Sequence, residues 1–78
     1  MMTLEEFIVE FANQFEDADV SQFKADTNFK DIEGWDSLTA VSIINMIGKK
    51  CGVRLLGGDL RGAGNIREVY EIIQQRSQ

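Results

Sequence analysis

Apolar side chains recur with the period of an α-helix in three separate segments of this chain, and this periodicity constrains the fold more than any other feature. The first stripe, at i, i+3, i+4, i+7 and i+11, consists of Leu4, Phe7, Ile8, Phe11 and Phe15. Such spacing places the apolar side chains on one helical face, so we expect a helix from about Leu4 to Glu16. Thr3 and Glu6 form a capping-box pattern that favours a helix start at this point.

Two later segments show similar stripes. The first predicts a helix from Asp36 or Ser37 to about Lys50, and its apolar arc contains Ala40, Val41, Ile43, Ile44 and Ile47. The second predicts a helix from about Ile66 to Gln75, with a stripe formed by Ile66, Val69, Tyr70 and Ile73. Gly52 supplies a helix end after the first of these segments, and Asn65 with Glu68 supplies a capping box before the second.

The remaining segments lack a helical stripe, and no segment alternates as a strand would. Residues 17–36 form a long connection that would be packed against the core by Phe23, Phe29, Ile32 and Trp35. Residues 57–64 contain four glycines, so a helix there should be short and weak. We therefore predict an all-α fold in a single domain over residues 1–78. It is a small four-helix bundle with three main helices, one short third helix and a long loop between helices one and two.

The residue types present exclude several kinds of chemistry. Histidine is absent and Cys51 is the only cysteine, which removes Ser-His and Cys-His dyads and Cys/His zinc clusters, and we expect no metal site. Residues 1–36 carry ten acids and two lysines, whereas residues 37–78 carry six bases and three acids. The acidic total argues against nucleic-acid binding. Because there is no signal-peptide pattern and no apolar stretch of about 20 residues, we expect a cytoplasmic protein without membrane contact.

The tetrapeptide Trp35-Asp36-Ser37-Leu38 ends the long connection and opens the second predicted helix. It places the Ser37 hydroxyl at a helix N-terminus, where backbone N–H groups lack intrahelical partners and the helix dipole favours negative charge. A phosphate ester on Ser37 would be stabilised there. The plainer interpretation is that Asp36 and Ser37 only cap the helix, since both residue types are common N-caps.

In this context the motif resembles the attachment site of the acyl carrier protein family, whose members are phosphopantetheine-binding carrier domains. The resemblance covers nearly the whole chain: a phenylalanine-rich first helix, a long acidic loop, Asp36-Ser37-Leu38, a short third element and a last helix rich in Ile, Val and Tyr. It implies that a phosphopantetheinyl transferase attaches 4'-phosphopantetheine from coenzyme A to Ser37, and that Asp36 helps to orient the metal-bound phosphate in that encounter. The thiol of the arm would hold acyl groups as thioesters, and the domain itself would catalyse nothing.

The resemblance also implies a monomeric carrier whose partners are acyl-loading and ketosynthase-type enzymes. We expect these enzymes to contact the second helix at Leu38, Thr39, Ser42 and Met46. Fatty-acid carriers usually line this helix with acids, whereas this chain has Thr39, Ser42 and Asn45 there, followed by Lys49. This departure indicates a specialised fatty-acid or polyketide-type pathway and docking that depends little on charge attraction at the second helix. In the alternative, docking uses the loop acids Asp26, Asp31, Glu33 and Asp36.

Three functions stay open at this point. The chain is an acyl carrier, an aminoacyl or D-alanyl carrier that shares the serine and the arm, or an unmodified helical protein-interaction module. In each of them the core should bring together Phe7, Phe11, Phe15, Val41, Ile44, Ile47, Val69 and Ile73. In a carrier this core would also leave a compressible space for an acyl chain.

Overall fold

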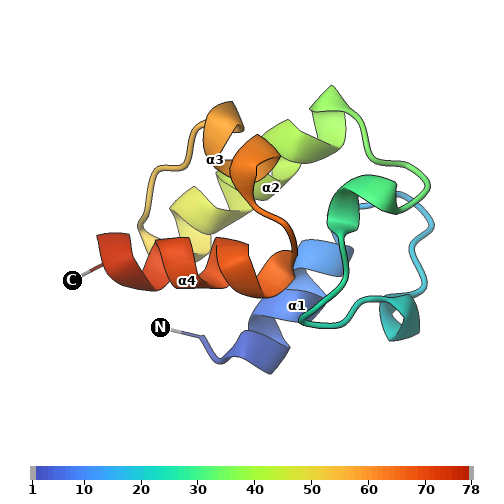
Figure 1. Ribbon diagram of the computed structural model, residues 1–78, viewed down its shortest axis with the longest axis horizontal. Helices are drawn as coiled ribbons and strands as arrows, with labels where there is room; N and C mark the ends of the chain where they lie inside the picture. The colour runs from blue at the N-terminus through green and yellow to red at the C-terminus, as the bar shows by residue number, and fades with distance from the viewer. Residues whose placement is uncertain (1, 78) are drawn as a thin grey trace.

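Four α-helices form the architecture of the computed structural model, which describes residues 2–77 (Figure 1). They are α1 (Leu4–Ala12), α2 (Ser37–Cys51), α3 (Gly57–Gly62) and α4 (Ile66–Arg76). Helix α1 packs against α2 and α4, and α2 also packs against α3. No strand occurs within residues 2–77. The predicted all-α fold, with a short third helix and a long loop between the first two helices, is confirmed.

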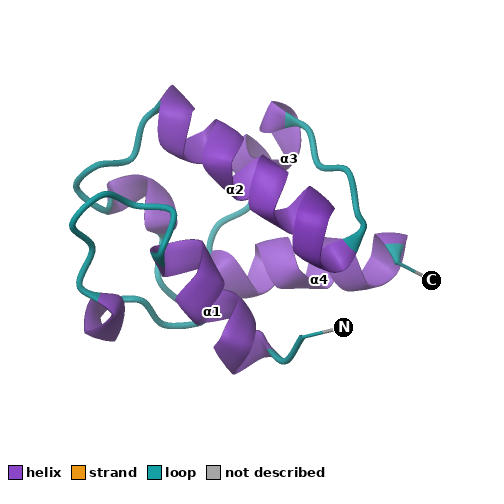
Figure 2. Cartoon of the chain, turned by 180° about the vertical axis from the view of Figure 1, so that it is seen from behind, coloured by secondary structure: helices purple, strands orange, loops and turns teal. Residues whose placement is uncertain are grey.

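Aromatic side chains from α1 and from the long α1–α2 connection form the centre of the core. The ring of Phe11 meets that of Phe29 edge to face, with centroids 5.0 Å apart, and Phe15 meets Phe23 in the same way at 5.0 Å. All four side chains are buried. Such pairs add to the free energy gained by burial. They hold the connection, which includes the single-turn 3₁₀ helices Val20–Gln22 and Phe29–Asp31, against one end of the bundle (Figure 2).

Helix α1 is shorter than the sequence predicts, because it ends at Ala12 and not near Glu16. Beyond Ala12 the N–H groups of Gln14 and Phe15 bond to carbonyl groups three residues earlier, which tightens the chain into turns. Asp17 then takes a left-handed backbone conformation with φ 57°, which a right-handed helix cannot include. The turns still direct Phe15 into the core, so its predicted burial is confirmed although its predicted helix is wrong.

Helix α2 presents a different part of its apolar arc to the core than the sequence predicts. Val41 is 53% exposed, so its predicted place in the core is wrong, and Ile44 is only partly buried. The face in contact with the core is spaced i, i+4, i+7 and i+8, and it consists of Thr39, Ile43, Met46 and Ile47. The apolar arc of α2 is wider than the surface that α1 and α3 offer it. Its edge at Val41 is therefore left to solvent.

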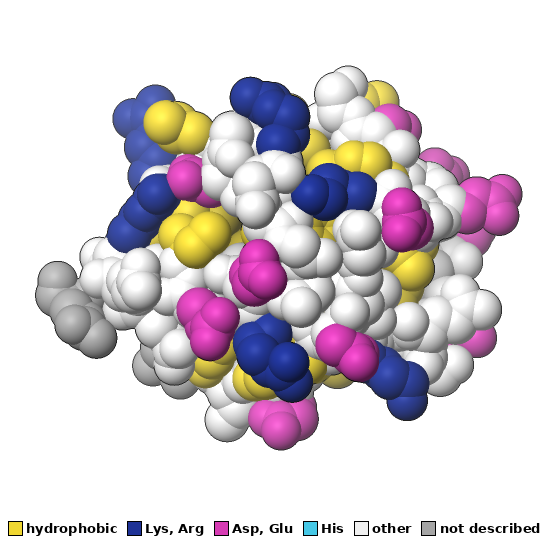
Figure 3. All heavy atoms as spheres, in the orientation of Figure 1, with side chains coloured by type: hydrophobic (Ala, Val, Ile, Leu, Met, Phe, Trp, Pro, Cys, Tyr) yellow, Lys and Arg dark blue, Asp and Glu magenta, His cyan; other side chains and the backbone are white. Residues whose placement is uncertain are grey.

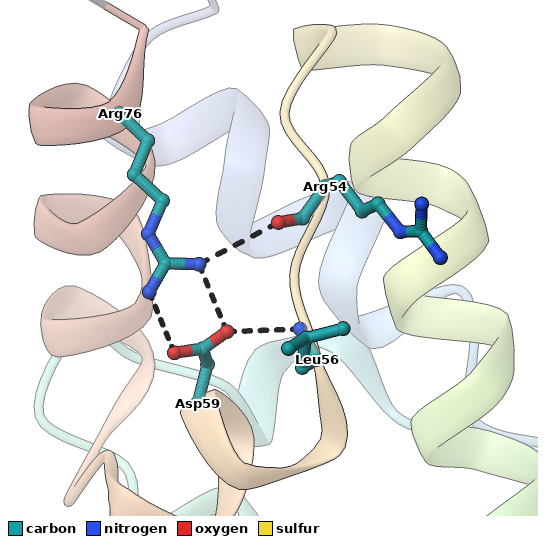
Figure 4. Close-up of polar contacts among 4 residues, drawn as sticks. All are labelled: Arg54, Leu56, Asp59 and Arg76. Carbon is teal, nitrogen blue, oxygen red and sulfur yellow. Dashed lines mark hydrogen bonds and ion pairs between the residues drawn. The ribbon is translucent and has the colours of Figure 1, made fainter.

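A bidentate ion pair connects the N-terminal end of α3 to α4. The guanidinium of Arg76 donates to both carboxylate oxygens of Asp59, at 2.7 and 2.9 Å, and lies 3.5 Å from the Arg54 carbonyl oxygen (Figure 4). Asp59 also accepts the Leu56 N–H at 2.8 Å, which satisfies one donor at the helix start. The hydrogen bonds from Arg76, and then that from Leu56, lower the pKa of the Asp59 carboxyl from 3.8 to about 2.

The C-terminal end of α3 is held by a residue of the long connection. The ammonium group of Lys30 donates to the Arg61 carbonyl at 2.8 Å and to the Ala63 carbonyl at 2.7 Å. Carbonyl groups at the end of a helix lack intrahelical donors, and a cation suits the negative end of the helix dipole. A six-residue helix with three glycines has little stability of its own, so these two contacts from distant segments keep α3 in place.

Candidate functional site

The N-terminus of α2 is closed by the side chain and the backbone of Asp36. Its carboxylate accepts a hydrogen bond from the Thr39 N–H at 2.8 Å, and its carbonyl accepts one from the Ala40 N–H at 3.0 Å. These bonds begin the helix at Ser37, as the sequence predicts. The bond from the Thr39 N–H also lowers the pKa of the Asp36 carboxyl, so this group stays ionised at neutral pH.

The Ser37 side chain is exposed on the first turn of α2. Asp36 accepts hydrogen bonds from the N–H groups of Thr39 and Ala40, whereas the N–H of Ser37 donates to no group within residues 2–77. Because α2 is 15 residues long, its aligned peptide dipoles give this end a partial positive charge. A primary alcohol in this position is accessible to another protein, and a negatively charged group attached to it would be stabilised.

Trp35 fixes the chain two residues before Ser37. Its indole ring lies edge to face with Phe29, with ring centroids 5.1 Å apart, and beside Phe15 at 6.2 Å. The side chain is partly buried in this aromatic group and packs against the core. The predicted role of Trp35 as an anchor for the connection is confirmed. Because Trp35 is held against the core, the end of the connection, and with it the exposed Ser37, has a defined position.

The tight turn formed by residues 32–35 is bonded to α2 by the side chain of Thr39, a contact that the sequence did not predict. The Trp35 N–H donates to the Ile32 carbonyl at 3.1 Å, and Gly34 at the third position of the turn has φ +97°. This conformation suits glycine, as in a type II turn. The Thr39 hydroxyl then donates to the Gly34 carbonyl at 3.0 Å. Gly34 was a recognisable turn signal, but nothing in the sequence indicated its bond to Thr39.

Residues 6–73 match the family model described as "Phosphopantetheine attachment site". The chain belongs to this family. Its carrier domains bear a covalently attached 4'-phosphopantetheine, so the predicted cofactor and the resemblance to acyl carrier proteins are confirmed. No curated protein and no solved structure matches the chain. The family match does not name the attachment residue, and Ser37 therefore stays a prediction.

The geometry around Ser37 fits the group that the family carries. The hydroxyl is exposed, the positive end of α2 lies behind it, and Leu38 next to it is 77% exposed, so neighbouring side chains leave room for an attached arm. The carboxylate of Asp36, the residue before Ser37, is directed to the Thr39 N–H. Such a site can hold a phosphodiester on Ser37 without burying its charge.

The four residues expected to contact partner enzymes differ in accessibility. Leu38 is the most exposed large apolar side chain of α2, and Ser42 is partly buried. Thr39 and Met46 are 8% and 5% exposed, so a partner cannot reach either side chain directly on the free protein, and their contact with partner enzymes stays a prediction. Both lie on the face that α2 turns to the core, and the Thr39 hydroxyl is already bonded to Gly34. Leu38 and Ser42 remain the predicted contacts that a partner could reach directly.

Among residues 2–77, no helix is both long enough and apolar enough to cross a membrane.

Proposed function

We propose that this protein is a discrete acyl carrier protein that bears its 4'-phosphopantetheine on Ser37 and serves a specialised fatty-acid or polyketide-type pathway. The observation that carries the proposal is the exposed Ser37 at the capped N-terminus of α2, inside the segment matched by the family model. Trp35 and the turn at Gly34 hold this serine in a defined place. A defined and accessible hydroxyl is what a modifying enzyme requires.

The attachment reaction joins the Ser37 oxygen to the phosphate of coenzyme A that carries the pantetheine. One O–P bond forms, the nucleotide part of coenzyme A leaves, and the hydroxyl proton must go to a base. Asp36 is poorly suited to be that base, because its carboxylate accepts the Thr39 N–H and its pKa is lowered. The transferase therefore supplies the base, and the domain contributes position and the positive helix end. Once attached, the arm offers a thiol that holds acyl groups as thioesters.

The surface of α2 supports assignment to a specialised pathway. The helix contains no acid between Ser37 and Cys51, and its last turn carries Lys49 and Lys50. Partner enzymes that recognise an acidic helix would meet the wrong charge here. An aminoacyl or D-alanyl carrier would use the same serine and arm, because partners select the cargo. An unmodified interaction module would have the same cap but no attached group.

Intact-mass spectrometry tests this proposal. The purified protein is incubated with coenzyme A, Mg²⁺ and a phosphopantetheinyl transferase of broad specificity. We expect a mass gain of one phosphopantetheine, and no gain in the Ser37→Ala variant. Ser21→Ala, which removes another exposed hydroxyl, in the connection before α2, should be modified like the parent protein. A parent protein that gains no mass, or a Ser37→Ala variant that gains the full group, would refute the proposal.

A further inference from the structure

An open groove with a volume of about 600 Å³ lies between the second half of α2 and the segment that leads into α3. Ile44, Gly48 and Lys49 line it from α2, and Arg54 and Leu56 line it from the connecting segment. Ile44 is partly buried and Leu56 is 62% exposed, so the groove offers apolar surface to solvent. Exposed large apolar side chains that gather beside a groove are typical of protein-binding sites.

The charge around this groove is positive. From Ser37 to Gly58 the chain has no acidic residue, and Lys49 and Arg54 lie in the groove itself. Within residues 2–77 neither of them has a carboxylate partner, whereas Lys50 is paired with Glu10. Figure 3 shows Lys and Arg side chains together with exposed hydrophobic ones, and an acidic side chain among them, over α3 and the segment before it.

A third cation lies at the rim of the groove. A Cβ atom added to Gly57 would lie 3.1 Å from a guanidinium nitrogen of Arg61, and one added to Gly58 would lie 3.7 Å from the other. The Arg61 side chain therefore covers the start of α3 beside the groove. Asp59, the acid of that same helix, is already neutralised by Arg76. The local field thus favours a partner that carries carboxylates.

An exposed apolar ridge connects the groove to the start of α2. Leu38 and Val41, which are 77% and 53% exposed, share one helical face with Gly48 and Lys49. Lys49 lies twelve positions after Ser37 along the helix, which at the α-helical rise is a distance of about 18 Å. A partner seated in the groove would therefore follow the ridge towards Ser37 while leaving the serine uncovered.

We propose that this groove, with its ridge, is a docking site for an acidic amphipathic helical segment of a partner protein, whose apolar side chains meet Ile44 and Leu56 while its carboxylates face Lys49 and Arg54. The biological role of this docking site rests on the proposed carrier function, but the binding of the helical segment does not require the phosphopantetheine arm. Charge attraction at α2 is then larger than the sequence led us to expect, and its sign is opposite to that expected for a carrier whose second helix is acidic. Acidic partner segments are selected, and basic docking patches are rejected.

The test uses the unmodified, ¹⁵N-labelled protein and a synthetic peptide with leucines at i, i+3, i+4 and i+7 flanked by glutamates. Amide shifts during the titration should be largest around Gly48, Gly52 and Gly57. The double variant Lys49→Glu/Arg54→Glu should bind about tenfold more weakly or worse, because each reversal replaces attraction by repulsion. Arg67→Glu makes the same charge change on α4, away from the groove, and should bind like the parent protein.

Two further peptides separate the contributions. A peptide with serines in place of the leucines, and one with lysines in place of the glutamates, should both fail to shift the groove amides. The proposal is overturned by shifts that map to residues 17–36, by equal binding to the double variant, or by equal binding of the lysine peptide. Because the titration needs no arm, a negative result leaves the mass test of Ser37 unaffected. Conversely, if the protein bound the acidic peptide but gained no phosphopantetheine in the mass test, it would be an interaction module that uses this groove.

Discussion

Removal of the charge on Asp59 should loosen α3 by a measurable amount. The Asp59→Asn variant keeps an oxygen that can accept the Leu56 N–H, so the start of α3 retains its hydrogen bond and only the ion pair with Arg76 is lost. The pKa of Asp59 lies at about 2 rather than 3.8, and at about 1.4 kcal/mol per pKa unit this corresponds to roughly 2.5 kcal/mol at most, part of which comes from the Leu56 N–H that the variant keeps. The side chain of Arg76 is 44% exposed, so solvent screens the pair, and we expect about 1 kcal/mol.

The pH dependence follows from the direction of the pKa shift. The folded-state pKa is lowered, so the stabilisation is fully present above the unfolded value of 3.8 and is lost as the pH falls towards about 2. The parent protein should therefore lose about 1 kcal/mol more than Asp59→Asn between pH 5 and pH 2. Other acids titrate in this range too, but their contribution is common to both proteins and cancels in the difference.

Urea denaturation followed by circular dichroism, on Asp59→Asn, Arg76→Gln and the double variant, measures the coupling free energy. Arg67→Gln is the control, because it removes a charge from an exposed face of the same helix without breaking an ion pair found in the structure. A coupling below about 0.3 kcal/mol at pH 7, which is within the usual scatter of additivity, would contradict the reasoning. So would a coupling that stayed unchanged at pH 2.

Two further predictions concern the core and the turn before the serine. Phe11→Ala should lower the free energy of unfolding, measured by urea denaturation, by about 3–5 kcal/mol, because this ring is fully buried. Val41→Ala should change it by less than about 0.5 kcal/mol, because Val41 is exposed. Similar losses at both sites would mean that α2 is rotated about its axis relative to the described structure. Gly34→Ala should lower the free energy of unfolding by about 1–2 kcal/mol, because Gly34 has φ +97°. Gly62 has open space around its Cβ position and no positive φ, so Gly62→Ala should be neutral or stabilising. A Gly34→Ala variant as stable as the parent protein would exclude the described turn.

The parts of the fold that depend on local sequence patterns were predictable. The Asp36 cap, the Gly52 end of α2 and the apolar period of α4 each act over a few residues, and the structure confirms all three. The orientation of α2 was harder, because a wide apolar arc fits several rotations about the helix axis. Only packing against the other helices decides that Met46 is buried and Val41 is not.

Contacts between distant segments were not predictable from any pattern. Lys30 reaches carbonyl groups 31 and 33 residues away, and Arg76 reaches Asp59 across 17 residues. In the sequence both cations are ordinary surface residues with several equivalent neighbours. For the candidate site, the serine and its cap followed from helix chemistry. The groove did not, since it depends on where the segment between Gly52 and α3 lies beside α2.

The position of Trp35 makes the site directly observable by optical spectroscopy. It is the only tryptophan of the chain, so intrinsic fluorescence excited at the indole band comes from one place, two residues before Ser37. The ring is partly buried between Phe15 and Phe29, so its emission depends on whether the connection stays docked on the core. An event that moved the start of α2, such as esterification of the serine or capture by an enzyme, could then be followed in real time without an added dye.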